Sequence, residues 1–469
     1  YKGIINNFIR VNDDKTISLT NCCAVAGLGP GATPTVEAAI KQVDPKGKVK
    51  HNARRDGSYK YYLSEPIRDN DAKGLGPFIW ASLEMEALGY DTDNTTASID
   101  RSAVVSRNNP VVTKADVLSS LTVGNGVIAA TVDVTGLQSF PEDYVNGVPL
   151  TTMSAWGWHS FPNTKNLKAC DSEKSFDLGH GHQEVYAVEY KTAGRNKDAT
   201  DYLRINPHRL NLGTFGLTFK NSEGQTLTLA DIKNIKQEQK LWDGLIESNY
   251  TVDGMPVEVT TGAMAKEKGM QGLFTHVKSP LFSKKQAAFT LRLPYPTGKH
   301  ADDATDWNNA DKHSSEIVCA DSTEALVKHT IDATTYYILL RWDGKATFSQ
   351  TAPHTYMLTP ETDVIGVSVC YNETNQLPGA AKGITLDNAK AWEYDQERKA
   401  CMKFWPSFWN SGAIVDFSLC TDPRAKELER RTVLSQYLTF VNCGDGSVPP
   451  QETGLTYNSW FGRPHLEMT

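Results

Sequence analysis

The last stretch of the sequence places aromatic, basic and acidic side chains within a few residues of one another. Between Ser447 and Met468 the chain carries hydrogen-bond acceptors, donors and an indole ring, which is the mixture that holds sugar hydroxyls and orients an anomeric centre. An irregular surface loop rarely concentrates Trp, Phe and Arg in so short a run. We therefore treat this stretch as a candidate substrate-binding segment, with the members Gln451, Glu452, Asn458, Trp460, Arg463, His465 and Glu467.

A second dense aromatic group lies between Thr151 and Asn163. Two indoles, Trp156 and Trp158, come directly before His159, so the group could form a stacking wall with a hydrogen-bonding tip. The alternative is that the same rings pack the edge of a β-sandwich against the next domain. Both interpretations stay open, and Trp156 and His159 are the candidate substrate contacts.

A third group lies in Asp56–Pro77, where tyrosines and charged residues crowd the loop before an expected helix. Stacking rings with fixed carboxylates suit a ligand that has an apolar face and many hydroxyls. A helix-capping loop with packed tyrosines explains the composition equally well. The candidate contacts here are Tyr62, Glu65 and Asp71.

Metal and cofactor signals are weak. His180 and His182 alternate along an extended run, but no other ligands lie nearby in sequence and a Gly-rich turn is the simpler interpretation. The eight cysteines have no C-x-x-C spacing, so we expect no metal and no cofactor. Most cysteines are interpreted as small buried hydrophobes, as in 367–370 and 417–420. Their even number permits disulfides, and we favour a periplasmic or secreted location over a cytoplasmic one.

Composition excludes several classes of function. The 469 residues are 39% hydrophobic and 9% aromatic, which is enough apolar surface for two or three folded cores. The net charge of -7, with Lys and Arg scattered along the chain, argues against a nucleic-acid partner. No apolar run approaches the roughly 20 residues that span a bilayer.

The hydrophobic pattern changes period twice and predicts three kinds of structure. Residues 78–88 have helical spacing and stop at Gly89. From about 104 to 384, short runs rich in β-branched and aromatic residues, with turns at 253–254 and 343–344, predict a large antiparallel β-sandwich. Two amphipathic helices are expected over 389–405 and 422–438, the second with Pro423 at its first helical position.

Residues 1–90 resemble the C-terminal part of the unsaturated rhamnogalacturonyl hydrolases, glycoside hydrolase family 105. The resemblance rests on Tyr61-Tyr-Leu-Ser-Glu-Pro66, Asn70-Asp71 and Gly74-Leu-Gly-Pro-Phe78. It implies the end of an (α/α)6 barrel that supplies at most substrate-side contacts, because the family's catalytic Asp lies earlier in the fold.

Residues 108–469 resemble the N-terminal half of six-hairpin glycosidases related to glycoside hydrolase families 65 and 95. The resemblance follows the order of three motifs: 156–163 in the sandwich, 404–411 in the linker helices and 458–467 at the first loop of a barrel. It implies a β-supersandwich, linker helices and a second truncated (α/α)6 barrel. The loop departs from the relatives, since it has Pro-His-Leu-Glu where they have a Trp-Asp-Thr-Glu-type motif.

The two resemblances together imply four parts: a barrel piece at 1–90, a linker at 91–107, a β-supersandwich at 108–384, and linker helices with a barrel start at 385–469. They imply a bacterial glycoside hydrolase that cleaves plant or host glycans. Because its general acid would lie outside the chain, we expect these residues alone to be an inactive, incomplete part of the enzyme. A non-catalytic carbohydrate-binding or structural sandwich and a family 65-like phosphorylase are the alternatives.

Overall fold

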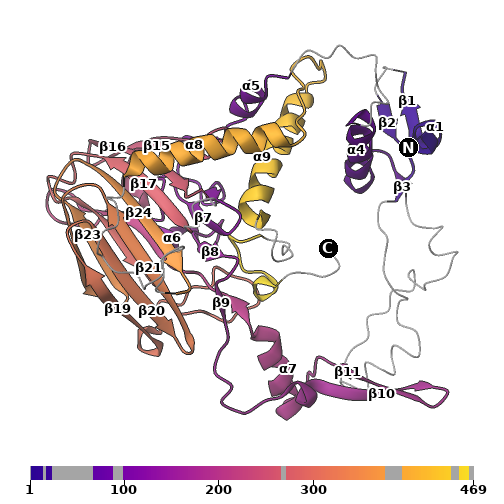
Figure 1. The fold of residues 1–469 in the computed structure, drawn as a ribbon, viewed down its shortest axis with the longest axis horizontal. Coiled ribbons are helices and arrows are strands. Elements are labelled where there is room, and N and C mark those ends of the chain that lie inside the picture. Colours follow the sequence, from indigo (N-terminus) through magenta and orange to yellow (C-terminus); the bar gives the residue numbers. More distant parts are fainter. Residues whose placement is uncertain are drawn as a thin grey trace. The chain divides into compact units, whose positions relative to one another are not determined.

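The computed structural model describes residues 2–13, 17–23, 67–87, 99–265, 271–374, 393–444 and 454–463. The chain divides into two compact units (Figure 1). One consists of Tyr1–Ser98 and Lys165–Tyr202, and the other of Ile99–Thr164 and Leu203–Thr469. The second unit holds the large sheets and most of the candidate residues.

A nine-stranded sheet in which every neighbouring pair is antiparallel forms the main layer of the second unit. Its strands are rich in Val, Ile, Thr and Tyr, whose branched or aromatic side chains pack well on a pleated surface. In spatial order the strands are β19 (His313–Ala320), β20 (Glu324–Ile331), β21 (Thr334–Trp342), β24 (Val364–Asn372), β17 (Gly272–Lys278), β16 (Met255–Ala263), β15 (Leu245–Val252), β14 (Ile232–Lys240) and β5 (Val111–Val112).

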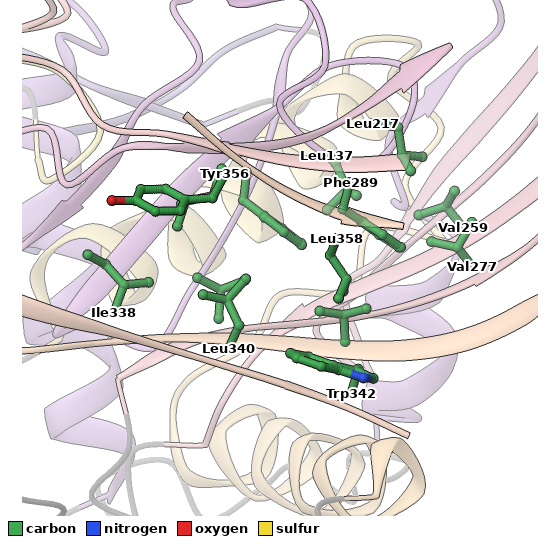
Figure 2. Packing of buried hydrophobic residues seen from close by; sticks show 14 of the residues in the cluster. Leu137, Leu217, Val259, Val277, Phe289, Ile338, Leu340, Trp342, Tyr356 and Leu358 are labelled. Atoms are coloured by element: carbon green, nitrogen blue, oxygen red, sulfur yellow. The ribbon is translucent and has the colours of Figure 1, made fainter. Parts of the chain in front are cut away.

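A four-stranded antiparallel sheet packs on this layer and completes the sandwich. Figure 2 shows Ile338, Leu340 and Trp342 of one sheet pointing toward Tyr356 and Leu358 of the other, and all five are buried. These five are every second residue of their strands, because successive side chains of a strand point to opposite faces and only one face lies in the core. The antiparallel sheets predicted between 104 and 384 are therefore confirmed. The strands are β13 (Thr214–Phe219), β18 (Ala287–Arg292), β23 (Thr355–Pro360) and β22 (Ala346–Ala352).

The two predicted turns have different roles. Asp253 and Gly254, with φ of 48° and 74°, form the two-residue turn of the β15–β16 hairpin, as the sequence predicts. Asp343 and Gly344 do not close a hairpin, since β21 pairs with β20 and β24 and the next strand lies in the other sheet. This second turn carries the chain from one layer to the other.

Three helices pack on the sheets of this unit: α8 (Tyr394–Ser411) lies on the nine-stranded sheet, α5 (Arg101–Ser106) contacts α8, and α9 (Ala425–Cys443) packs on the strands Leu121–Gly124 and Ile128–Val132. Figure 1 shows α8 running across the sheet, where it contacts β16, β17 and β24. In α9 the buried residues recur every fourth position from Ala425 to Val441, the spacing of one helix face. The two helices predicted near the end are confirmed, but α9 begins after Pro423 and not at it. The stretch expected as a linker, 91–107, contains α5.

Smaller elements complete the second unit and position its loops. A three-stranded sheet joins Leu121–Gly124, Ile128–Val132 and Thr152–Ser154, and a two-stranded sheet pairs residues around 158 and 208. These elements are β6 (Leu121–Gly124), β7 (Ile128–Val132), β8 (Thr152–Ser154), β9 (Trp158–His159), β12 (His208–Arg209), α6 (Pro141–Tyr144), and the 3-10 turns η2 (Leu229–Asp231), η4 (Ala310–Lys312) and η5 (Trp460–Gly462).

The described part of the first unit contains one long helix, α4, and several short elements. The helix predicted at 78–88 begins earlier, at Ala72. The described part of residues 1–90 shows two helices and two short strand pairs, and the antiparallel helix pairs that a barrel piece predicts are not among them. The elements are α1 (Lys2–Phe8), β1 (Ile9–Val11), β2 (Ile17–Leu19), β3 (Cys22–Cys23), β4 (Ile67–Arg68), α4 (Ala72–Ala87), η1 (Ala169–Ser172), β10 (Glu173–Gly179), β11 (His182–Ala187) and the start of α7 (Arg195–Ile205).

The cysteines match the sequence interpretation only in part. Cys370 and Cys401 are buried, whereas Cys170 and Cys420 are exposed. The expectation that Cys420 is buried is therefore wrong, because residues 412–424 form a surface connection between α8 and α9 and not a strand. Seven of the eight cysteines are described as free thiols. None of the described helices has the length and apolar composition needed to cross a membrane.

Candidate functional site

Arg209 joins two of the three candidate segments. It lies on β12, which pairs with β9 so that Arg209 is opposite Trp158, and its guanidinium group lies 4.7 Å from the centre of that indole. Nη1 of Arg209 donates to the carbonyl of Ser154 at 2.6 Å, and Nη2 donates to the carbonyl of Gly462 at 3.2 Å. The side-chain amide of Asn458 donates to the Arg209 carbonyl at 3.0 Å. Residues 151–163 and 454–463, far apart in sequence, therefore share one buried arginine.

The segment 454–463 is bound to the rest of the second unit near its start and in its middle. Near its start, the side-chain oxygen of Asn442 in α9 accepts the Leu455 amide at 3.0 Å, and the Thr151 hydroxyl donates to the Thr456 carbonyl at 2.6 Å. In its middle, Asn458 and Asp302 exchange two backbone hydrogen bonds of 2.9 and 3.1 Å. These bonds hold the loop against the sandwich in one conformation.

Trp460 is presented to solvent by a strained turn. Trp460, Phe461 and Gly462 have φ of 49°, 58° and 75°, and the left-handed region costs a non-glycine residue about 1 kcal/mol or more. Phe461 is 7% exposed, so its burial offsets part of this strain, while Trp460 is 42% exposed. A Cβ on Gly462 would lie 2.5 Å from the Cβ of Arg209, so the turn needs glycine at this position. The geometry leaves the Trp460 indole partly exposed.

His300 is the aromatic neighbour of Trp460 at the surface. The two rings meet edge to face with centroids 5.0 Å apart, and the Phe461 amide donates to the His300 carbonyl at 3.1 Å. His300 is exposed. Nearby, burial raises the pKa of Asp302, so its carboxyl group holds a proton more readily than an exposed one. An exposed indole beside an imidazole can stack on the apolar face of a sugar and hydrogen-bond its hydroxyls.

Trp156 and His159 point into the protein and not toward this surface. The indole N–H of Trp156 donates to the side chain of Gln271, and its ring packs edge-on against Tyr336. His159 is buried, with Nε2 3.2 Å from the Asp332 carboxylate. Burial lowers the pKa of His159, and the Asp332 charge opposes that shift. Both side chains pack against residues of their own unit and not, as the alternative had it, against a next domain. Their role as substrate contacts stays a prediction.

The side chains of Arg463 and Asn458 donate hydrogen bonds to backbone carbonyls. Arg463 donates to the carbonyls of Leu203 and Pro207 at 3.0 Å each, and to that of Asn206. Asn458 is 2% exposed. Both therefore support the exposed Trp460 turn, and neither presents its side chain at the surface as Trp460 does.

Among the remaining candidates, the structure describes Asp71. Asp71 lies in the other unit, where its carboxylate accepts the Lys73 amide at 3.1 Å at the start of α4. Its hydrogen bonds to Lys73 lower the pKa of Asp71. The other candidates lie outside the described residues: Tyr62, Glu65, Gln451, Glu452, His465 and Glu467.

Sequence reasoning missed a group of three histidines. One ring nitrogen from each of His313, His329 and His354 lies within 4.8 Å of the others, and within the described ranges these three alone form a group suited to a metal ion. Burial lowers the pKa of His313 to about 4 and that of His329 well below its ordinary value. No sequence motif could reveal this group, because strand pairing brings its members together. His180 and His182, the pair the sequence singled out, lie in the exposed β10–β11 hairpin.

No protein-family model matches the chain, and no curated protein matches it. Among solved structures, it is similar to a protein assigned as a kojibiose phosphorylase, from the human microbiome, with a TM-score of 0.45 and 12% identity over 76% of this chain and 44% of that one. It is also similar to a family 92 α-mannosidase from Bacteroides thetaiotaomicron, with a TM-score of 0.25 and 9% identity over 52% of this chain and 33% of that one. Both are carbohydrate-active enzymes. The chain spans less than half the length of either structure.

Proposed function

We propose that this chain is part of a carbohydrate-active protein of the glycoside hydrolase type and that its surface around Trp460 contacts the glycan. The observation that carries the proposal is the exposed indole at the strained turn. Backbone strain persists only where surrounding contacts over-determine it, and it clusters at ligand-binding positions. Here the strained turn is held by the hydrogen bond from Arg209 to the Gly462 carbonyl and by the one from Asn458 to the Arg209 carbonyl.

The surface has the composition of a sugar subsite. Trp460 offers a flat apolar face, and the exposed His300 offers ring nitrogens for hydroxyl groups. The partner is an oligosaccharide or polysaccharide of plant or host origin, with neutral sugars or uronic acids. We assign glycan contact to these residues and not proton transfer, because cleavage needs two carboxylates set across one glycosidic bond.

Two other functions use the same surface. A non-catalytic carbohydrate-binding sandwich would retain glycans without cleaving them. A phosphorylase would use phosphate in place of the water that a hydrolase activates. The exposed indole fits all three, so activity assays and not binding distinguish them.

Binding is tested with a matched pair of tryptophan variants. Trp460→Ala should lower affinity for a bound oligosaccharide about tenfold or more in glycan-array retention and titration calorimetry, because a stacked ring is lost. Trp80→Ala is the control, since Trp80 is 75% exposed on α4. Equal retention by both variants would remove the Trp460 surface from the proposal.

Reaction class is tested on pectin, unsaturated uronosyl oligosaccharides and α-linked disaccharides. Release of reducing sugar without phosphate supports hydrolysis, whereas turnover that requires phosphate supports phosphorolysis. Retention of glycan by the full-length protein with no product in either buffer would establish the binding function and contradict the enzymatic one.

A further inference from the structure

Three imidazoles from both layers of the sandwich meet at one end of it. His313 begins the edge strand β19, His329 lies on the neighbouring β20, and His354 lies in the turn between β22 and β23. The first two belong to the nine-stranded sheet and the third to the four-stranded sheet. Their facing nitrogens lie within 4.8 Å of one another.

The hydrogen bonds of His329 determine which of its nitrogens carries the lone pair. The Tyr336 hydroxyl donates to the Leu212 carbonyl at 2.9 Å, so toward His329 it acts as an acceptor. Nδ1 of His329, 2.8 Å from that hydroxyl, therefore carries the proton. Nε2 is left with its lone pair, and it faces Nδ1 of His313 at 2.6 Å.

His354 is oriented in the same way. A backbone carbonyl can only accept, so Nε2 of His354 donates to the Ala310 carbonyl at 2.8 Å. Nδ1 then carries the lone pair, and it lies 2.9 Å from the Ser315 hydroxyl. Metal-ligating histidines usually donate their second N–H to a carbonyl or another acceptor, which fixes the ring. Tyr336 and Ala310 already fill that role for two of the three rings.

Two of the three histidines line a surface depression that is open to solvent, and two carboxylates act on one of them. His313, Ser315 and His354 line an open surface depression of about 500 Å³, while His329 lies buried behind them. The charges of Asp306 and Asp311 act on His313 in the sense that favours a nearby cation. A bound ion could therefore keep one coordination position open to water.

We propose that His313, His329 and His354 bind one divalent transition-metal ion, with Zn²⁺ as the best match, and that the ion links the two sheets of the sandwich. Three imidazoles and one open position are a common zinc arrangement. With Zn–N distances of about 2.0–2.1 Å, tetrahedral ligands lie about 3.3 Å apart. To bind the ion through Nδ1, His313 must give up its hydrogen bond to His329 and transfer its Nδ1 proton to Nε2 through solvent. His354 must likewise release the hydrogen bond that its Nδ1 accepts from the Ser315 hydroxyl. This site is independent of the proposed glycan surface.

The test is metal titration of the untagged chain after removal of metal with a chelator. Exposed thiols also bind Zn²⁺, so the titrations use a Cys170→Ser, Cys420→Ser background. Calorimetry with Zn²⁺ should show one site per chain, and Co²⁺ should give the visible absorption of a tetrahedral site. Thermal unfolding should shift upward with Zn²⁺, because the three imidazoles come together only in the folded chain.

Two variants at the rim, His313→Gln and His354→Gln, should each weaken Zn²⁺ binding at least tenfold and reduce the thermal shift. His182→Gln, in the β10–β11 hairpin, is the matched control and should behave as the parent protein. Circular dichroism of each variant shows whether it is folded. Binding that is absent in the parent protein, or that survives unchanged in both rim variants, would overturn the proposal.

Discussion

The indole ring of Trp405 lies directly against the backbone of Gly244: a Cβ at position 244 would be 1.7 Å from the indole Nε1. This contact seats α8 on the nine-stranded sheet, and Gly244→Ala must push the helix away. We expect a loss of about 3 kcal/mol or more in the free energy of unfolding, measured by urea denaturation. Gly254→Ala is the control, because Gly254 has a similar φ of 74° but nothing within 4 Å of its Cβ. Equal losses would mean that backbone strain, and not the Trp405 contact, makes Gly244 necessary.

Replacing the buried Asp133 carboxylate with an amide should destabilise the protein. Each of its carboxylate oxygens accepts two hydrogen bonds, one oxygen from the amide and hydroxyl of Thr135 and the other from the amides of Ser139 and Phe140. Asp133→Asn replaces one acceptor with a donor and leaves two buried donors without a partner, at a cost of about 2–4 kcal/mol. Asp321→Asn should cost far less, since one oxygen of Asp321 accepts all of its backbone hydrogen bonds and can be kept. Urea unfolding of the two variants tests this difference.

Glu429 joins α9 to α5 and to the loop before α9. Its two oxygens accept from the Arg107 guanidinium at 2.8 and 2.7 Å, from Asn108 at 2.8 Å and from the Phe417 amide at 2.7 Å. Glu429→Gln should cost about 1–2 kcal/mol of unfolding free energy, because an amide nitrogen cannot accept the bonds that one buried carboxylate oxygen accepts. Arg107, whose side chain is 37% exposed, keeps its ion pair with Asp416, which limits the loss. Glu427→Gln, two residues earlier on the exposed face, should cost less than about 1 kcal/mol. Similar values for both variants would contradict the assignment of Glu429 as the link.

His208 should make the protein sensitive to acid. Burial, together with the nearby His159, lowers the pKa of His208 to about 3. Below its ordinary pKa of 6.5 the unfolded chain takes up a proton that the folded chain does not, so stability falls as the pH falls from about 6.5 toward 3. One such group contributes up to about 1.4 kcal/mol per pH unit in this window.

His208→Phe should reduce that slope while keeping the stack with Phe161, whose ring centre lies 4.8 Å from that of His208. The measurement is the urea midpoint at several pH values between 4 and 7. His182→Phe, at an exposed hairpin position, is the control and should leave the slope unchanged. An unaltered slope in His208→Phe would show that other groups carry the acid sensitivity.

Much of the secondary structure could be predicted because its signals are local. The strands at 335–342 and 363–369 were visible as β-branched and aromatic runs, and the structure places strands at Thr334–Trp342 and Val364–Asn372. Helix starts were less accurate: α4 begins six residues before the predicted position and α9 begins beyond Pro423. The role of Asp343-Gly344 could not be predicted, because a turn sequence does not specify which sheet receives the next strand.

The sequence by itself determined the sandwich and the helices after it, since the period of apolar residues follows from how a strand or a helix turns its side chains. It also located the aromatic segments around 156 and 460. Only the tertiary structure decided that Trp156 and His159 face inward while Trp460 is exposed, because that depends on the long-range contacts of Arg209 and Gln271. The meeting of His313, His329 and His354 is likewise a tertiary result: two sheets must pack before imidazoles so distant in sequence can approach one another.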